Sequence, residues 1–194
     1  MDSEAKATIK RLYLLRHCKA EGQDSYAPLT AKGMHQANIL ADLMVEFGIT
    51  GIRCSPFVRA TSSIMPFSLK TGIPVTVDEE LAERRLGICP TEDWKAALKA
   101  TFENDMLAYP EGESSKTALE RGRAALHRAL TLQGATPLIV THGNLLTLLL
   151  CSFDKRFGFD EWERMKSPAL YLVETRGTIS NVISMEEQCH VLDV

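Results

Sequence analysis

The sequence lacks several features that define whole classes of protein. Its five cysteines are scattered and never spaced as C-x-x-C, which disfavours a disulfide framework or a zinc site and favours reduced thiols. The most apolar run, residues 145–153, is interrupted by Thr147 and Ser152 and is too short to span a bilayer. Neither charge dominates, since 22 Lys and Arg face 25 Asp and Glu. We therefore expect no nucleic-acid or membrane partner.

The N-terminus carries acidic residues and no apolar region of the signal-peptide kind, so we expect a cytoplasmic protein. Several catalytic motifs are also missing, namely G-x-G-x-x-G, the P-loop, H-E-x-x-H, the EF-hand loop and G-x-S-x-G. The cysteine–arginine spacing of tyrosine phosphatases is absent too, because Cys54 and Arg59 are one residue too close. Two histidines at strand ends could hold a metal, but no carboxylate or thiolate cluster completes such a site. We expect neither a metal nor a cofactor.

Strands and helices alternate along the chain with no linker or repeat, so we expect one domain over residues 1–194. Apolar runs predict strands at 9–15, 51–54, 74–77 and 137–140, with a terminal hairpin of 170–173 and 179–184. Helical patterns predict helices at 30–47, 93–108 and 115–132, another after 143, and one capped by Ser55 and bent or ended at Pro66. This order predicts a three-layer, doubly wound α/β fold, with helices on both faces of a mainly parallel sheet.

Polar residues follow three of the predicted strands. Arg16 and His17 end the first strand, Arg59 lies in the first turn after the second, and T-H-G at 141–143 follows the fourth. Ligands bind beyond the carboxyl ends of parallel strands, so neighbouring strands would bring two imidazoles and two guanidiniums to one crevice. Guanidinium groups and helix N-termini bind anions, and the guanidinium fork matches phosphate oxygens. The pattern therefore predicts a phosphate pocket.

Five ordered blocks of sequence resemble the histidine phosphatase superfamily, the phosphoglycerate-mutase-like clan. They are L-L-R-H-C-K-A at 14–20, S-P-F-V-R-A at 55–60, L-A-E-R-R-L-G at 81–87, E-G-E-S at 111–114 and T-H-G at 141–143. The blocks run in family order from about residue 12 to residue 174. The resemblance implies the phosphoglycerate-mutase-like fold, with a capping insert at about 88–115 that overhangs the pocket.

The resemblance also implies roles for individual residues. His17 would be the nucleophile, because a neutral imidazole can attack phosphorus and form a phosphohistidine. Glu83 would be the general acid for the leaving oxygen. The residues implied in substrate binding are Arg16, Arg59, His142, Gln23 and Gly143. Charge at Lys19, Arg84 and Arg85 would favour an anionic substrate.

Two departures from the family pattern leave the substrate open. Cys18 stands where the family has glycine, and Gln23 stands where many relatives have asparagine. The R-H-x-K-A form is similar to small protein-phosphohistidine phosphatases, whereas the G-E-S turn resembles larger phosphatases that act on small molecules. The resemblance leaves both substrate classes open.

The resemblance implies a metal-independent phosphomonoesterase, a phosphoric monoester hydrolase acting through a phosphohistidine. The insert is short, and a mutase needs a larger cap to keep water from its bisphosphorylated intermediate. A cofactor-dependent phosphoglycerate-type mutase and a weakly catalytic phosphoprotein-binding or regulatory module are the alternatives. We expect a phosphorylated small molecule as substrate, with a phosphoprotein as the other possibility, and a monomer or homodimer.

Overall fold

A computed structural model describes residues 9–131 and 135–187 of the chain. Its strands are β1 (Lys10–Arg16), β2 (Gly51–Cys54), β3 (Val75–Val77), β4 (Pro137–Thr141), β5 (Ala169–Arg176) and β6 (Ile179–Ser184). Its α-helices are α1 (Ala31–Met44), α2 (Val58–Thr71), α3 (Trp94–Glu103), α4 (Ser115–Leu130), α5 (Gly143–Phe153) and α6 (Phe159–Arg164). Two 3-10 turns, η1 (Val45–Phe47) and η2 (Glu79–Leu81), complete the described elements.

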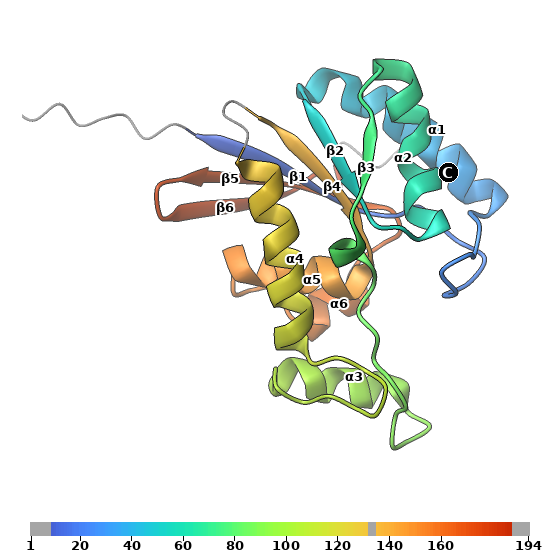
Figure 1. Ribbon diagram of the computed structural model, residues 1–194, viewed down its shortest axis with the longest axis vertical. Coiled ribbons are helices and arrows are strands. Elements are labelled where there is room, and N and C mark those ends of the chain that lie inside the picture. The colour runs from blue at the N-terminus through green and yellow to red at the C-terminus, as the bar shows by residue number, and fades with distance from the viewer. Residues whose placement is uncertain (1–8, 132–134, 188–194) are drawn as a thin grey trace, which may run out of the picture.

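The six strands form one sheet in the order β3-β2-β4-β1-β5-β6. The first four strands of the chain are parallel, and β5 and β6 form an antiparallel hairpin that continues the sheet beside β1. The mainly parallel α/β sheet and the terminal hairpin are therefore confirmed. Figure 1 shows α1 and α2 on one face of the sheet and α4 and α5 on the other, while α3 lies beyond the strand ends.

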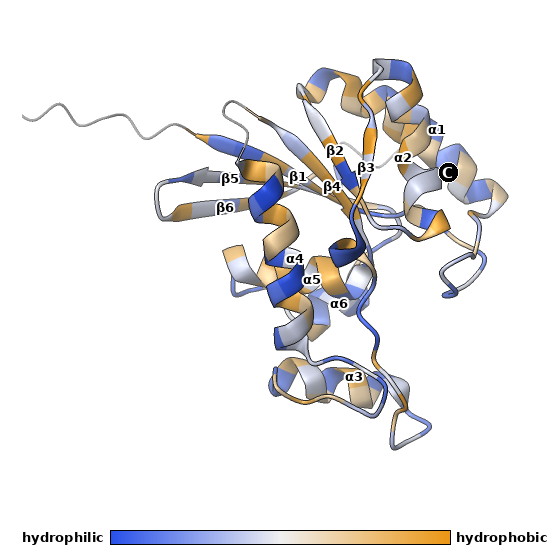
Figure 2. Ribbon diagram, in the orientation of Figure 1, coloured by the Kyte–Doolittle hydropathy of each residue, from blue (hydrophilic) through white to orange (hydrophobic). Residues whose placement is uncertain are grey.

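The sheet buries two apolar faces because side chains alternate along each strand. On β1, Tyr13 and Leu15 pack with α1 and α2, whereas Leu12 and Leu14 pack with α4 and α5. Figure 2 shows hydrophobic residues along the central strands, between these helical layers. Helix α5 is buried over its first eight residues, which fixes its N-terminus against the sheet. No described helix has the length and apolar character that crossing a membrane requires.

The predicted start of the helix that follows β2 is wrong. Helix α2 begins at Val58, not at Ser55, because the Ser55 amide donates to Val140 O at 2.9 Å and keeps the chain extended beyond β2. Pro66 does not end the helix, which continues to Thr71, and the burial of Ile64 and Phe67 offsets the missing hydrogen bond; a bend at Pro66 stays a prediction.

Helix α3 stops at Glu103, although the pattern predicts a helix to residue 108. The Asn104 side chain accepts from the Met106 amide at 3.1 Å, a local bond that competes with the helix. The predicted N-cap at Thr30 is confirmed, since its hydroxyl accepts from the Gly33 amide at 2.9 Å. Helix α6 was not predicted, because six residues are too few to show helical periodicity.

Candidate active site

The strand order places the predicted site residues at one edge of the sheet. Strand β4 lies between β2 and β1, so the carboxyl ends of all three strands meet. The rings of His17 and His142 lie edge to face with centroids 5.1 Å apart, and Arg59 Nε lies 3.2 Å from His17 Nε2. Each of these three side chains is at least 94% buried. The structure thus brings His17, His142 and Arg59 together, as the strand ends predict.

His17 is held as a neutral imidazole whose ring lone pair lies on Nε2. Its Nδ1 lies 2.7 Å from the Cys18 carbonyl, which can only accept, so Nδ1 carries the hydrogen. Its Nε2 accepts from Arg59 Nε, which can only donate. The pKa of His17 is lowered to about 4, mainly by burial and also by the charges of Arg59 and Arg16, against the opposing effect of the Cys18 carbonyl bond. At neutral pH, Nε2 can act as a nucleophile once phosphorus takes the place of the Arg59 Nε–H at its lone pair.

Arg59 is positioned by backbone carbonyls of the loop that follows β1. Its Nη1 donates to Gln23 O at 3.1 Å and to Asp24 O at 2.6 Å, which leaves Nε directed at His17. Its Cζ also lies 4.8 Å from the centre of the Phe57 ring. A guanidinium fixed in this way can stabilise negative charge without moving.

Arg16 enters the same site from the end of β1. Its Nη1 donates to the carbonyls of Met165 at 2.5 Å and Lys166 at 3.2 Å, in the segment after α6. Its Nε is buried with no partner among the described residues, so a donor remains for an anion. A Cβ on Gly143 would lie 3.2 Å from Arg16 Cζ, so the glycine at this position gives the guanidinium its room.

Glu83 caps the N-terminus of α5. Its carboxylate accepts from the amides of Asn144 at 3.1 Å and Leu145 at 3.0 Å, and from its neighbour Arg84 at 2.8 Å. We expected helix N-termini to bind the anion directly, but Glu83 takes these amides of α5. The negative charge of this carboxylate also acts on Arg16 and Arg59, so it lies within electrostatic range of both guanidiniums.

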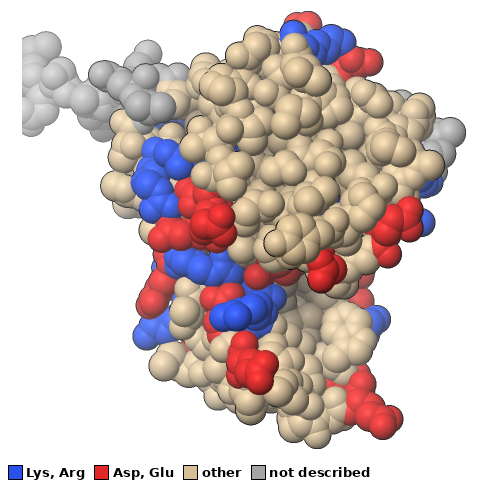
Figure 3. Space-filling model, turned by 45° about the vertical axis from the view of Figure 1, so that its right-hand side comes forward, with Lys and Arg blue, Asp and Glu red and all other residues tan. Residues whose placement is uncertain are grey.

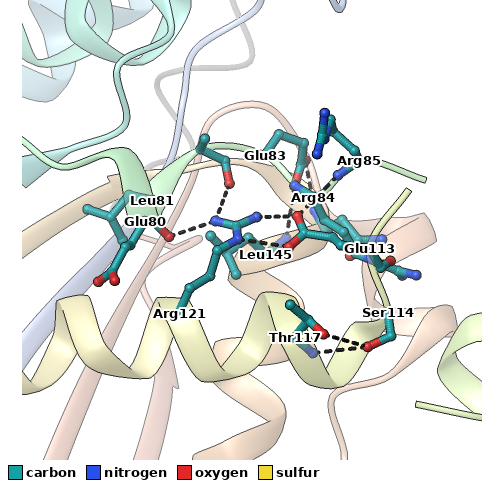
Figure 4. Close-up of polar contacts among 12 residues, drawn as sticks. Glu80, Leu81, Glu83, Arg84, Arg85, Glu113, Ser114, Thr117, Arg121 and Leu145 are labelled. Atoms are coloured by element: carbon teal, nitrogen blue, oxygen red, sulfur yellow. Dashed lines mark hydrogen bonds and ion pairs between the residues drawn. The ribbon is translucent and has the colours of Figure 1, made fainter. Parts of the chain in front are cut away.

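An arginine that the motifs do not mark supports the Glu83 segment. Arg121 of α4 donates to the carbonyls of Glu80 and Ala82 at 2.7 and 2.8 Å, and it binds the Glu113 carboxylate at 2.6 and 3.0 Å (Figure 4). Glu113 belongs to the G-E-S turn, and its carbonyl accepts from Arg84 Nε at 3.1 Å. The G-E-S turn therefore supports the backbone that carries Glu83.

Charged residues next to this support form a mixed network on the surface. Arg128 binds both Asp78 and Glu80, and Asp78 also binds Arg53 at 3.1 Å. Figure 3 shows basic and acidic side chains side by side in a band between the sheet-bearing body and the α3 end of the molecule. Because positive and negative side chains alternate in this band, it does not form the uniformly positive surface that would bind a polyanion.

Cys18 and Gln23, the two departures from the family pattern, differ in burial: Cys18 is buried and Gln23 is exposed. The Cys18 side chain is fully buried beside Ser63 in the apolar cluster under α1 and α2, and burial raises its pKa to about 12. Its amide donates to Ser63 Oγ at 2.8 Å. Gln23 contributes its carbonyl to Arg59 while its side chain is exposed. A side-chain contact from Gln23 to substrate stays a prediction.

Several residues that hold the site have no motif to mark them. Ser63 donates to Arg59 O at 2.6 Å, and Ser167 donates to His17 O at 2.7 Å. Gln36, buried on α1, accepts from the Lys19 amide at 3.1 Å. A polar residue on the buried face of a helix is the one signal that could have drawn attention to Ser63 and Gln36.

Residues 88–114 carry α3 away from the sheet. Trp94 of α3 packs edge-on against Trp162 of α6 with ring centroids 6.0 Å apart, and Lys95 binds Glu163 at 2.9 Å. Arg84 ties α3 to the body, since its Nη1 donates to Thr101 Oγ at 2.7 Å. Thus the expected capping segment contacts both the Glu83 loop and α6.

The described part of the chain shows neither a metal site nor a disulfide. No three His, Cys, Asp or Glu side chains gather there as a metal site would need. The cysteines described are free thiols, and Cys189 lies outside the described residues.

Comparison with known proteins defines the family. The sequence profile of the histidine phosphatase superfamily (branch 1) matches residues 12–179, so the chain belongs to that superfamily. A curated relative, "Probable phosphoglycerate mutase GpmB" of Escherichia fergusonii, is 31% identical over 171 residues, which cover 78% of this chain and 77% of that protein.

Solved structures share the fold. Bacillus stearothermophilus YhfR superposes with a TM-score of 0.74 at 25% identity, over 90% of this chain and 96% of that one. A mycobacterial glucosyl-3-phosphoglycerate phosphatase superposes with a TM-score of 0.73 at 20% identity, over 91% and 98%. The phosphoglycerate-mutase-like fold implied by the sequence motifs is confirmed.

Proposed function

We propose that the protein is a metal-independent phosphomonoesterase that hydrolyses a small phosphate ester through a phosphohistidine at His17. One observation carries the proposal: Nε2 of a buried, neutral His17 accepts a hydrogen bond from Arg59 Nε at 3.2 Å, so the nucleophilic nitrogen and a fixed guanidinium are in contact. A phosphorus atom attacked by this nitrogen would have the guanidinium beside its oxygens, where charge develops during transfer. The family to which the chain belongs supports phosphate chemistry.

The reaction would proceed in two balanced steps. In the first, His17 Nε2 bonds to phosphorus, the ester P–O bond breaks, and protonated Glu83 gives its proton to the leaving oxygen. In the second, water attacks phosphorus, Glu83 takes a proton from that water, and the N–P bond breaks. The sum is ester plus water giving alcohol plus phosphate. Arg16, Arg59 and His142 would bind the phosphoryl oxygens in both steps.

We infer that residues 88–115 cap this site and contact the part of the substrate that leaves. The aromatic contacts of α3 with α6 and the tie through Arg84 support a segment held over the strand ends. The exposed Arg85 and Lys19 offer positive charge for an anionic substrate. The free thiols of Cys18 and Cys54 fit the reducing cytoplasm, where we propose that the enzyme acts.

A phosphoglycerate-type mutase is the second candidate, because the curated relative from Escherichia fergusonii carries that name. A mutase must retain a bisphosphorylated intermediate and keep water from the phosphohistidine. Between η2 and α4, the described segment contributes a single helix of 10 residues, α3. So short a cap favours water as the acceptor of the phosphoryl group, and hence hydrolysis.

Turnover of an aryl phosphate in the presence of a chelator tests the proposal. We expect wild-type turnover to survive the chelator, His17→Ala to abolish it, and the exposed-surface control His35→Ala to retain it. Rapid quenching at neutral pH, followed by mass spectrometry, should locate an acid-labile phosphoryl group on His17. A requirement for added divalent metal, or an adduct on another residue, would contradict the mechanism.

The same preparation separates the alternatives. A mutase would convert 3-phosphoglycerate to 2-phosphoglycerate only after priming with a bisphosphoglycerate, and would release little phosphate. A phosphoprotein-binding or regulatory module would bind inorganic phosphate in calorimetry without turning over any ester. A panel of phosphorylated metabolites and phosphohistidine peptides would then identify the substrate class.

A further inference from the structure

Ser55 and His142 form a buried pair beside the nucleophile. The Ser55 hydroxyl lies 2.7 Å from His142 Nε2, and both side chains are fully buried. The ring of His142 also packs against Phe57, with centroids 4.8 Å apart, and against His17. The imidazole therefore has one orientation and a single side-chain partner at Nε2 among the described residues.

The direction of this hydrogen bond follows from the other contact of the hydroxyl. The Phe57 amide donates to Ser55 Oγ at 3.3 Å, so one lone pair of the oxygen is used. A hydroxyl has one hydrogen to donate, and in the described structure His142 Nε2 is the acceptor available to it. Donation from Ser55 to Nε2 gives the hydroxyl hydrogen an acceptor, and in that arrangement a neutral His142 carries its hydrogen on Nδ1. Burial supports the neutral form, because it lowers the pKa of His142 well below its ordinary value.

The other nitrogen of the ring is poised for an anion. His142 Nδ1 is buried and has no partner among the described residues. The charges of Arg59 and Arg16 act on this imidazole, so it lies in the same electrostatic environment as the guanidinium pair. Phosphoryl oxygens only accept hydrogen bonds, so Nδ1–H would attract them whereas a bare Nδ1 lone pair would repel them.

We propose that Ser55 is a positioning residue that selects the Nδ1–H tautomer of His142 and so makes this imidazole a hydrogen-bond donor to the transferring phosphoryl group. The inference rests on the proposed function for its catalytic consequence, but the tautomer itself can be measured separately. Ser55 acts through His142 and does not touch the reacting atoms.

Nitrogen NMR of the wild-type enzyme labelled with 15N-histidine tests the tautomer directly. Long-range proton–nitrogen correlations distinguish a protonated from an unprotonated ring nitrogen, and His142→Asn assigns the signals. We expect the His142 hydrogen on Nδ1. A hydrogen on Nε2 would overturn the proposal, whether or not any Ser55 variant folds.

The catalytic consequence is tested with Ser55→Ala and the matched control Ser68→Ala. Ser68 lies on α2, and its hydroxyl donates to Ile73 O at 2.7 Å, away from the strand ends. We expect Ser55→Ala to lose the single Nδ1–H signal pattern and to lower kcat about 10- to 100-fold. This is less than the about 100- to 1000-fold cost of removing a donor to a developing oxyanion, because His142 itself remains. Ser68→Ala should stay within about twofold of the wild-type kcat.

A folded Ser55→Ala enzyme with wild-type kcat and an unchanged His142 signal would refute the proposal. Failure of the proposed function gives a different result, because the wild-type enzyme would then form no phosphohistidine at His17. In Ser55→Ala the adduct should still form at His17, only more slowly.

Discussion

Acidification should destabilise this fold through His17, because the folded protein keeps that imidazole neutral. The pKa of His17 is about 4 in the folded state against 6.5 for an exposed histidine, with burial as the main cause. Between these values the unfolded chain binds a proton that the folded chain does not, so the free energy of unfolding falls as the pH falls. At about 1.36 kcal/mol for each pH unit, the loss reaches about 3 kcal/mol at pH 4. Above pH 6.5 no such loss arises.

Urea unfolding of the wild type and of His17→Asn at pH 7, 5.5 and 4 measures this loss. The variant can differ in stability at pH 7, so only the change with pH is compared. Buried His142 adds to the loss in both chains, and no more in the variant than in the wild type, because His17 is one cause of its lowered pKa. We expect the wild type to lose about 3 kcal/mol more than His17→Asn between pH 7 and pH 4. His35→Asn, at an exposed position on α1, should follow the wild type. Parallel losses in the wild type and His17→Asn would refute the burial argument and with it the neutral nucleophile.

Three further substitutions test the roles of single groups. Arg59→Lys removes the Nε–H that meets His17, and an ammonium cannot reproduce the fork, so kcat/KM for an aryl phosphate should fall about 100- to 1000-fold. Gly143→Ala places a Cβ 3.2 Å from Arg16 Cζ, so KM should rise about 10-fold while the thermal midpoint is not lowered. Glu83→Gln should slow an alkyl phosphate about 100-fold more than an aryl phosphate, because the aryl leaving group needs no proton. Equal losses on both esters would exclude Glu83 as the acid.

The fold and the meeting point of the site could be predicted because both follow from simple patterns. Apolar runs at 9–15 and 137–140 predict strands, and parallel strands of the observed order bring their carboxyl ends together. Arg16, His17 and His142 lie directly at strand ends, so their convergence needs no knowledge of loops. Arg59 lies in the first turn of α2, as predicted, although the helix begins at Val58 and not after Ser55.

Other features depend on tertiary contacts that leave no periodic signal. Ser55 before proline has the pattern of an N-cap, yet the strand ladder keeps it extended and its hydroxyl bonds to His142. Glu83 lies in an acidic run typical of a solvated surface, but it caps α5, which begins 60 residues later in the chain. Arg121 shows no motif because its partners are two carbonyls and one carboxylate on other segments. Local propensity cannot report such contacts.

Arg16 and Arg59 show most clearly what the sequence alone cannot predict, because backbone atoms position both guanidiniums. Carbonyls of residues 23 and 24 hold Arg59, and carbonyls of residues 165 and 166 hold Arg16. A carbonyl is present at every residue, so no side-chain identity in those loops marks the function. It follows that substitutions of the exposed Gln23 and Lys166 side chains should matter less than changes that move these backbones. Arg16 and Arg59 can be identified from their sequence motifs, whereas the loops that position them can be identified only from the folded structure.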